Sequence, residues 1–120
     1  ARVEPGYMPM APSPAAFNAL KNAGLSISDV AAIKTHNPFA VNDIALARDT
    51  GFAWERMNNY GSSIIWGHPQ APTGLRAIIE LIEELVLRGG GVGLFTGCAA
   101  GDTGYATVLR VTYSKTTSKA

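Results

Sequence analysis

Residues 72–113 read PTGLRAIIELIEELVLRGGGVGLFTGCAAGDTGYATVLRVTY, and this stretch decides the fold because it holds a helix and two strands in succession. Apolar side chains recur around most of the axis of residues 73–88, which predicts a helix covered on several sides. A glycine triplet then ends the helix. Residues 92–96 are typical of a buried strand, and residues 105–113 alternate more clearly between apolar and polar. A turn region with two glycines joins these strands as an antiparallel pair.

The region before this stretch predicts two more helices and another strand. Ser13 is expected to cap a helix that starts with a proline, continues to Ala23 and stops at a glycine. Residues 29–35 are typical of a strand entering the core, and residues 39–49 of a helix. Helices that alternate with strands predict the α/β class, as a layered mixed β-sheet with residues 73–88 as a buried central helix.

The composition limits the classes of protein that this chain can represent. With 120 residues and 47% hydrophobic side chains, the chain is long enough for one domain with a real core. The net charge is +1 and there is no stripe of Lys and Arg, so we expect no nucleic acid partner. Charged residues interrupt the longest apolar stretch, so we expect no membrane span. A single cysteine excludes an intrachain disulfide and fits a reducing compartment, which predicts a cytoplasmic protein.

Two short motifs place reactive side chains among small residues. His68 lies between Gly67 and Pro69, and Cys98 lies in the stretch GCAAG of residues 97–101. A His and a Cys held on glycine-rich turns can form a proton-transfer pair. The alternatives are a histidine that satisfies a backbone carbonyl within its turn and a buried structural cysteine.

A third motif is His36-Asn37-Pro38-Phe39, at the carboxyl end of the first predicted strand. Ligands gather at such strand ends in open α/β sheets. The alternative is an Asn-Pro turn that its polar side chains hold together. No spacing of His, Cys, Asp and Glu predicts a metal site.

Four stretches follow one another along nearly the whole chain: residues 8–15 (MPMAPSPA), 36–40 (HNPFA), 58–69 (NNYGSSIIWGHP) and 97–104 (GCAAGDTG). Taken together and in this order, they resemble the C-terminal domain of the thiolases. The third is similar to the family's Asn-x-x-Gly-Gly-Ala-Ile-x-x-Gly-His-Pro block, and the fourth takes the place of its Cys-Ile-Gly-Gly-Gly-x-Gly loop. The resemblance implies a thiolase-like half and an acyltransferase that cleaves a 3-ketoacyl-CoA with CoA or runs the reverse Claisen condensation.

The resemblance also implies catalytic roles. His68 would take the proton of a nucleophilic cysteine and donate toward the thioester oxygen of the substrate. Cys98 would move the proton at the substrate α-carbon. His36 stands where the family has an Asn that holds a water in an oxyanion hole, and the backbone at Ala100 and Gly101 would serve a second hole around the acyl-cysteine.

Substrate contacts follow from the same resemblance. Met8, Asn37 and Phe39 match positions at the substrate, with Met8 and Phe39 on the path of the pantetheine arm. Coenzyme A would act as a substrate or product, and we expect no covalently bound cofactor.

The departures from the family pattern leave alternatives open. The histidine at position 36 resembles the sterol-carrier-type thiolases, and a second His is also similar to the decarboxylating ketoacyl synthases. Those synthases lack a cysteine at the position of Cys98, so Cys98 favours thiolase chemistry. Another alternative is a non-catalytic structural subunit or scaffold domain of an acyl-CoA complex.

The resemblance covers only part of a thiolase. Residues 1–113 are expected to form a partial C-terminal domain without its first strand, followed by a disordered tail at residues 114–120. The acylated cysteine of thiolases belongs to the N-terminal half, so we expect that half as a partner, either as a separate subunit or as a missing fragment. The complete enzyme would be a homo-oligomer that binds acyl-CoA, and this chain alone would expose an apolar surface.

Overall fold

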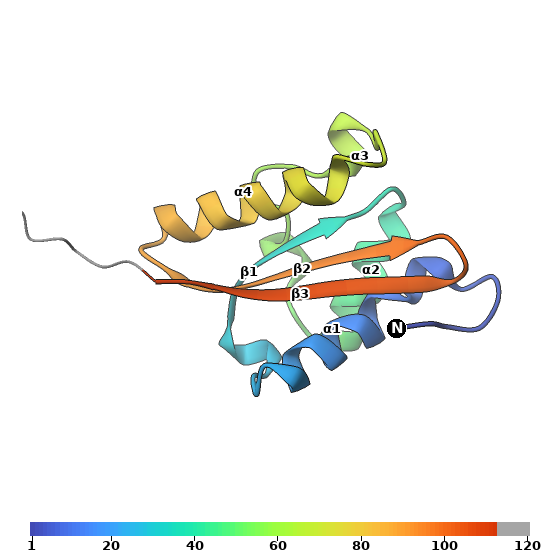
Figure 1. The fold of residues 1–120 in the computed structure, drawn as a ribbon, viewed down its shortest axis with the longest axis horizontal. Helices are drawn as coiled ribbons and strands as arrows, with labels where there is room; N and C mark the ends of the chain where they lie inside the picture. The colour runs from blue at the N-terminus through green and yellow to red at the C-terminus, as the bar shows by residue number, and fades with distance from the viewer. Residues whose placement is uncertain (113–120) are drawn as a thin grey trace, which may run out of the picture.

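A three-stranded mixed sheet forms the centre of the computed structural model, which describes residues 1–112 (Figure 1). The strands are β1 (Val30–His36), β2 (Gly91–Ala99) and β3 (Thr103–Val111), in the order β1-β2-β3. β1 pairs parallel with β2, and β2 pairs antiparallel with β3. The predicted mixed sheet and hairpin are therefore confirmed, while the predicted tail at residues 114–120 lies outside the described residues.

Helices cover both faces of the sheet (Figure 1). The longest, α4 (Thr73–Leu87), lies on one face, and α1 (Pro12–Asn22) lies on the other together with α2 (Ala40–Thr50). The remaining elements are short: the helix α3 (Ser63–Trp66) and the 3-10 turns η1 (Met8–Met10), η2 (Ile27–Asp29) and η3 (Trp54–Arg56). The predicted α/β class is confirmed, and α3 precedes the loop that carries His68.

The alternation of side chains along the strands divides the core into two clusters. Ile33 and Leu94 pack in the cluster formed with α1 and α2, whereas their neighbours Ala32 and Phe95 pack in the cluster under α4. Gly93 lies on the α4 side, where an added Cβ would come within 2.8 Å of Leu85. The absence of a side chain there lets α4 pack close to the central strand.

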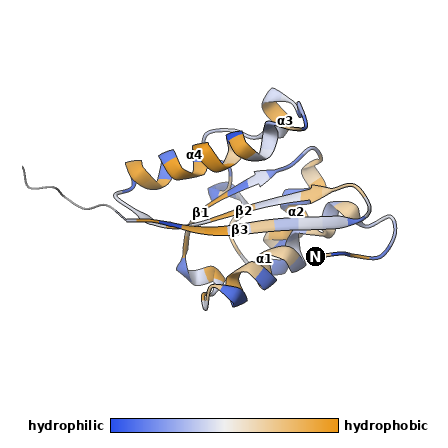
Figure 2. Ribbon diagram, in the orientation of Figure 1, coloured by the Kyte–Doolittle hydropathy of each residue, from blue (hydrophilic) through white to orange (hydrophobic). Residues whose placement is uncertain are grey.

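Only one side of α4 is covered within residues 1–112. Leu81 and Leu85 are fully buried against the sheet. The opposite side carries five exposed apolar side chains: Leu75, Ile79, Ile82, Val86 and Leu87. Figure 2 shows the apolar character of this helix along its length. The expectation of a helix covered on several sides is not met in this part of the chain, because no element lies on its outer side, and the expected exposed apolar surface is present. No helix among residues 1–112 is both long and apolar enough to cross a membrane.

Two local predictions were wrong. Helix α1 begins at Pro12 with Ala11 in the capping position, so Ser13 lies inside the first turn and does not cap it. The reason is that Ala11 already has helical angles and continues from η1, its N–H donating to the carbonyl of Met8. Cys98 lies on β2 itself rather than on the turn after it, because pairing with β3 continues to Ala99.

Candidate active site

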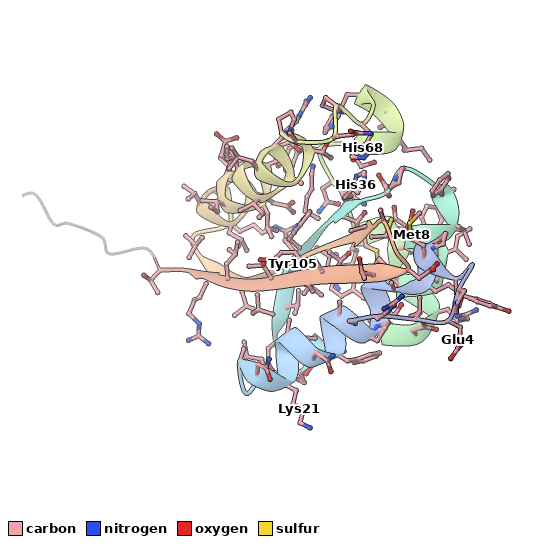
Figure 3. All side chains as sticks on the ribbon, turned by 45° about the vertical axis from the view of Figure 1, so that its right-hand side comes forward. Glu4, Met8, Lys21, His36, His68 and Tyr105 are labelled. Carbon is pink, nitrogen blue, oxygen red and sulfur yellow. The ribbon has the colours of Figure 1, made fainter. Side chains whose placement is uncertain are left out.

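Three of the predicted site residues meet at the carboxyl ends of the parallel strands. His36 is the last residue of β1 and lies opposite Gly97 of β2 in the strand register, so Cys98 is the next residue along β2. His68 comes from the loop between α3 and α4. Its ring centroid lies 4.1 Å from that of His36. Figure 3 shows the two histidines next to each other.

A cavity of about 460 Å³ opens at this edge of the sheet. Its wall contains both histidines and Cys98, together with Ala100 after β2 and Tyr105 on β3. His36, His68 and Cys98 thus border one cavity, and their catalytic roles stay predictions. A cavity bordered by two histidines and a cysteine has residue types that can bind a polar reacting group and move protons to and from it.

His36 is held inside the protein as a neutral ring. Its side chain is buried, and its Nδ1 lies 2.9 Å from the hydroxyl oxygen of Ser63 at the start of α3. Burial, and secondarily the charge of His68, lower the pKa of His36 to about 4. At neutral pH, His36 can accept or donate one hydrogen bond at its free nitrogen without carrying a charge.

His68 lies on the exposed side of the same cavity. Its Nδ1 is 2.9 Å from the hydroxyl oxygen of Thr73, the first residue of α4. Because Nδ1 is engaged by this contact, Nε2 is the nitrogen left for proton transfer. Gly67 before it has φ +88° and Gln70 after it has φ +62°, so the backbone around His68 takes left-handed angles on both sides. Such strain at a non-glycine residue is typical of functional sites.

Cys98 carries a thiol that stays protonated at neutral pH. Burial raises the pKa of this thiol above its ordinary value, and a contact from Asn42 opposes the rise only partly. The amide nitrogen Nδ2 of Asn42 lies 3.6 Å from Sγ of Cys98 and 2.8 Å from the backbone oxygen of Pro9. Asn42 therefore fixes the thiol from the α2 side, and a protonated thiol can act as an acid.

Trp66 anchors the loop that carries His68. The Arg76 guanidinium lies 4.1 Å from the ring centroid of Trp66, and Lys34 Nζ lies 5.2 Å from it. Lys34 donates a hydrogen bond of 2.6 Å to the carbonyl of Gly61 and pairs with Glu80 at 2.7 Å. These cation–π contacts and hydrogen bonds join β1, α3 and α4 beside the cavity.

The structure does not bring every predicted residue to the cavity wall. Asn37 is buried and bonded elsewhere: its amide nitrogen donates to Asp43, and its oxygen accepts from the backbone N–H of Ile64. Phe39 is exposed, and Met8 and Gly101 are likewise absent from the wall. The roles of Asn37, Phe39, Met8 and Gly101 stay predictions.

Sequence reasoning missed the residues that position the three reactive groups. These are Ser63 at His36, Thr73 at His68 and Asn42 at Cys98. Thr73 follows His68 closely in the sequence and begins a helix, so its contact with His68 could have been predicted. Asn42 and Ser63 give no such signal, because their contacts are made between segments far apart in the chain. Within residues 1–112, no three His, Cys, Asp or Glu side chains come together as a metal site.

The fold and the cavity together define an α/β domain whose parallel strands end at a cavity bordered by two histidines and one cysteine. Residues 1–111 match the family model described as thiolase, C-terminal domain, so the chain belongs to that family.

Several named proteins are similar to this chain in sequence or in structure. A 3-ketoacyl-CoA thiolase of Aliivibrio fischeri is 42% identical over 87% of this chain and 27% of its own length. An acetyl-CoA acetyltransferase of Syntrophomonas wolfei is 39% identical over 89% of this chain and 28% of its own length. The crystal structure of human mitochondrial 3-ketoacyl-CoA thiolase in complex with CoA superposes with a TM-score of 0.89 at 32% identity, covering 94% of this chain and 29% of that one. This chain thus spans under a third of the length of these relatives.

Proposed function

We propose that this chain provides the acid–base part of a thiolase-type acyltransferase site. The reaction is thiolysis of a 3-ketoacyl-CoA by CoA, or the reverse Claisen condensation. The nucleophilic cysteine comes from an N-terminal thiolase half, because Cys98 is the only cysteine in the 120 residues and has another task. The observation that carries the proposal is the shared cavity of His36, His68 and Cys98.

In the thiolysis direction, His68 activates the nucleophile. Its Nε2 takes the proton of the nucleophilic thiol, while Nδ1 stays bonded to Thr73. The thiolate forms a bond to the keto carbon of the substrate. The bond between that carbon and the α-carbon then breaks, and its electron pair moves onto the departing acetyl-CoA as an enolate.

Cys98 and His36 act on this enolate. The Cys98 thiol donates its proton to the α-carbon, a role that the raised pKa of the buried thiol supports. His36 stabilises the enolate oxygen, directly or through a bound water. CoA then gives its thiol proton to the Cys98 thiolate and attacks the acyl-cysteine, and the released nucleophile regains its proton from His68. After this step the nucleophilic cysteine, Cys98 and His68 have all returned to their starting protonation states.

The remaining groups are assigned to binding. The backbone N–H groups at Ala100 and Gly101 serve the oxyanion of the acyl-cysteine, which the place of Ala100 on the cavity wall supports. Met8, Asn37 and Phe39 contact the substrate, with Met8 and Phe39 along the pantetheine arm. Coenzyme A is thus a substrate or product of this site and not a bound cofactor.

The partner of this chain is proposed to be an N-terminal thiolase half. The exposed apolar side of α4 supports a large contact, because an apolar surface of this kind is rarely left open to water. We further propose that the complete enzyme is a homo-oligomer in the cytoplasm, where the single cysteine stays reduced. The mass of the reconstituted protein in solution tests the oligomer.

The direct test is acyl-enzyme formation by this chain fused behind the N-terminal half of a thiolase relative. His68→Ala should lower the rate of acylation by roughly 10²–10⁴-fold, the usual contribution of a general base. Lys21→Ala is the matched control, since Lys21 is exposed on α1 on the far face of the sheet. Near-normal acylation by His68→Ala would rule out its role, and an inactive fusion would favour the scaffold alternative.

A further inference from the structure

The hydrogen-bond partner of His36 determines more than the place of its ring. A neutral imidazole carries one proton, either on Nδ1 or on Nε2, and the neighbour of one nitrogen decides which nitrogen holds it. For His36 that neighbour is Ser63, with 2.9 Å between Nδ1 and the hydroxyl oxygen. Ser63 is buried, at 7% exposure, and so is His36.

The hydrogen of the buried Ser63 hydroxyl needs a hydrogen-bond acceptor. Among the described residues, His36 Nδ1 is the one polar partner found for this hydroxyl. If Nδ1 carried the ring proton, the hydroxyl hydrogen of Ser63 would face no acceptor, at a cost of roughly 1–3 kcal/mol for an unsatisfied buried donor. If the hydroxyl donates to Nδ1 instead, both groups are satisfied and the ring proton lies on Nε2.

We therefore propose that Ser63 is a positioning residue that holds His36 in the tautomer with its proton on Nε2. In this tautomer the neutral histidine presents an N–H donor to the cavity. Ser63 itself touches no reacting atom. The low pKa of His36, about 4, means that this donor remains uncharged through the neutral range. The inference rests on the proposed function only for its consequence, namely that the donor serves the enolate oxygen.

Thr73, the hydrogen-bond partner of His68, does not fix the tautomer of that ring. His68 is exposed, so water reaches its ring and either tautomer is compatible with the contact to Thr73. Free exchange of its proton suits a base, whereas a fixed proton suits a hydrogen-bond donor. The two neighbouring rings thus differ in chemistry because one is buried against a serine and the other is open to solvent.

The groups that face His36 agree with a neutral donor. Gly97 of β2 lies beside it, and the space next to Gly97 is bordered by His36 and by the uncharged ring of Phe95. From the loop, its close neighbour is His68, whose ring is 4.1 Å away and would repel a second positive charge. From α3, its partner is the uncharged Ser63. No carboxylate among the described residues bonds to the His36 ring.

The test is nitrogen NMR of the full chain labelled at its two histidines, because the ring nitrogen shifts distinguish protonated from unprotonated nitrogen. The wild type should show His36 as the Nε2–H tautomer alone at neutral pH. Ser63→Ala should show a mixture of both tautomers, and Ser63→Thr should restore the single one. Ser62→Ala is the control, since Ser62 is buried next to Ser63 but has no bond to the ring. Circular dichroism on each variant verifies that the fold is retained.

A wild-type His36 with its proton on Nδ1, or a Ser63→Ala spectrum identical to the wild type, would overturn the inference. A second readout is kinetic: in the fused enzyme, Ser63→Ala should lower kcat several-fold with KM unchanged, less than the roughly 10²–10³-fold loss typical of removing an oxyanion donor. An unchanged kcat would contradict the role toward the enolate. If the fusion is inactive but the tautomer is as stated, the proposed function fails and the inference about Ser63 holds.

Discussion

The imidazole rings of His36 and His68 lie with their centroids 4.1 Å apart and their planes tilted by 38°. His36 ends a buried strand, whereas His68 is exposed on a loop, and the two rings meet in the wall of one cavity. At this distance the two rings cannot both be protonated without strong repulsion. Together with burial, this repulsion keeps the His36 ring neutral at neutral pH.

The neutral state of His36 makes the stability of the fold depend on pH. Its pKa falls from about 6.5 in the unfolded chain to about 4 in the folded one, so the unfolded chain binds more protons between these values. The stabilisation is complete above pH 6.5 and is lost as the pH falls toward 4, by roughly 3 kcal/mol at most. Urea unfolding at pH 7 and pH 5 measures the loss.

A matched pair of variants separates His36 from the carboxyl groups that titrate in the same range. His36→Asn should flatten the dependence between pH 7 and pH 5, because the titrating ring is gone. His68→Asn should leave most of it, because His68 is exposed. Equal slopes in the wild type and in His36→Asn would show that His36 is not the group responsible.

Cys98 should react slowly with alkylating reagents at neutral pH. Its pKa is raised mainly by burial, and the thiolate is the reactive form. We expect the alkylation rate of the folded chain to rise only above the pH at which the same chain in urea already reacts. The measurement is unambiguous because the chain has one cysteine. Rapid alkylation of the folded chain at pH 7 would mean that Cys98 is a thiolate and not a proton donor.

Gly61 is the residue on which the Trp66 anchor depends. Gly61 has φ +96°, and a Cβ added there would come within 2.2 Å of the Trp66 ring. Gly61→Ala should therefore destabilise the fold by roughly 2–5 kcal/mol, the sum of backbone strain and overpacking. Gly24→Ala is the control, since Gly24 has φ +67° but open space around it, and should cost about 1–2 kcal/mol.

A second substitution tests the mechanism of that loss. Trp66→Leu in the Gly61→Ala background should recover part of the stability, because the smaller side chain removes the clash and leaves only the strain. Thermal unfolding of the four combinations gives the coupling. Additive effects of the two substitutions would contradict direct contact between positions 61 and 66.

The apolar side of α4 should carry the contact with the N-terminal half. Ile82→Glu places a charge in the middle of this exposed surface and should weaken association by at least tenfold, while the isolated chain keeps its stability. Lys21→Glu on α1 is the control and should leave association unchanged. Sedimentation of the mixed halves measures both, and equal association of the two variants would place the contact elsewhere.

Sequence patterns predicted the order of the elements well because each element has a clear local cause. The glycine triplet after α4 and the glycines of the β2–β3 turn fix where those elements end. The same patterns failed where one element runs into the next: Ala11 continues η1 into α1, and cross-strand pairing carries β2 past Gly97 to Ala99. Local propensity does not predict where these two elements begin or end, because contacts with neighbouring segments determine it.

The reactive residues of the candidate site could be predicted, but their supports could not. His68 and Cys98 stand out as rare residue types in stretches of small ones. Ser63 is an ordinary serine in sequence, and its importance arises only because α3 folds back onto the end of β1. The outer side of α4 illustrates the opposite case: its apolar pattern indicated coverage on several sides, but nothing among residues 1–112 covers that side.

Turnover of a 3-ketoacyl-CoA by the fused enzyme, with Cys98→Ser beside the wild type, tests the central claim most directly. The wild type should consume the substrate in a CoA-dependent reaction, and Cys98→Ser should be slower by roughly 10²–10⁴-fold while it unfolds at the same temperature. Thiolysis at the wild-type rate by Cys98→Ser would contradict the account, because the proton for the enolate would then have to come from another group.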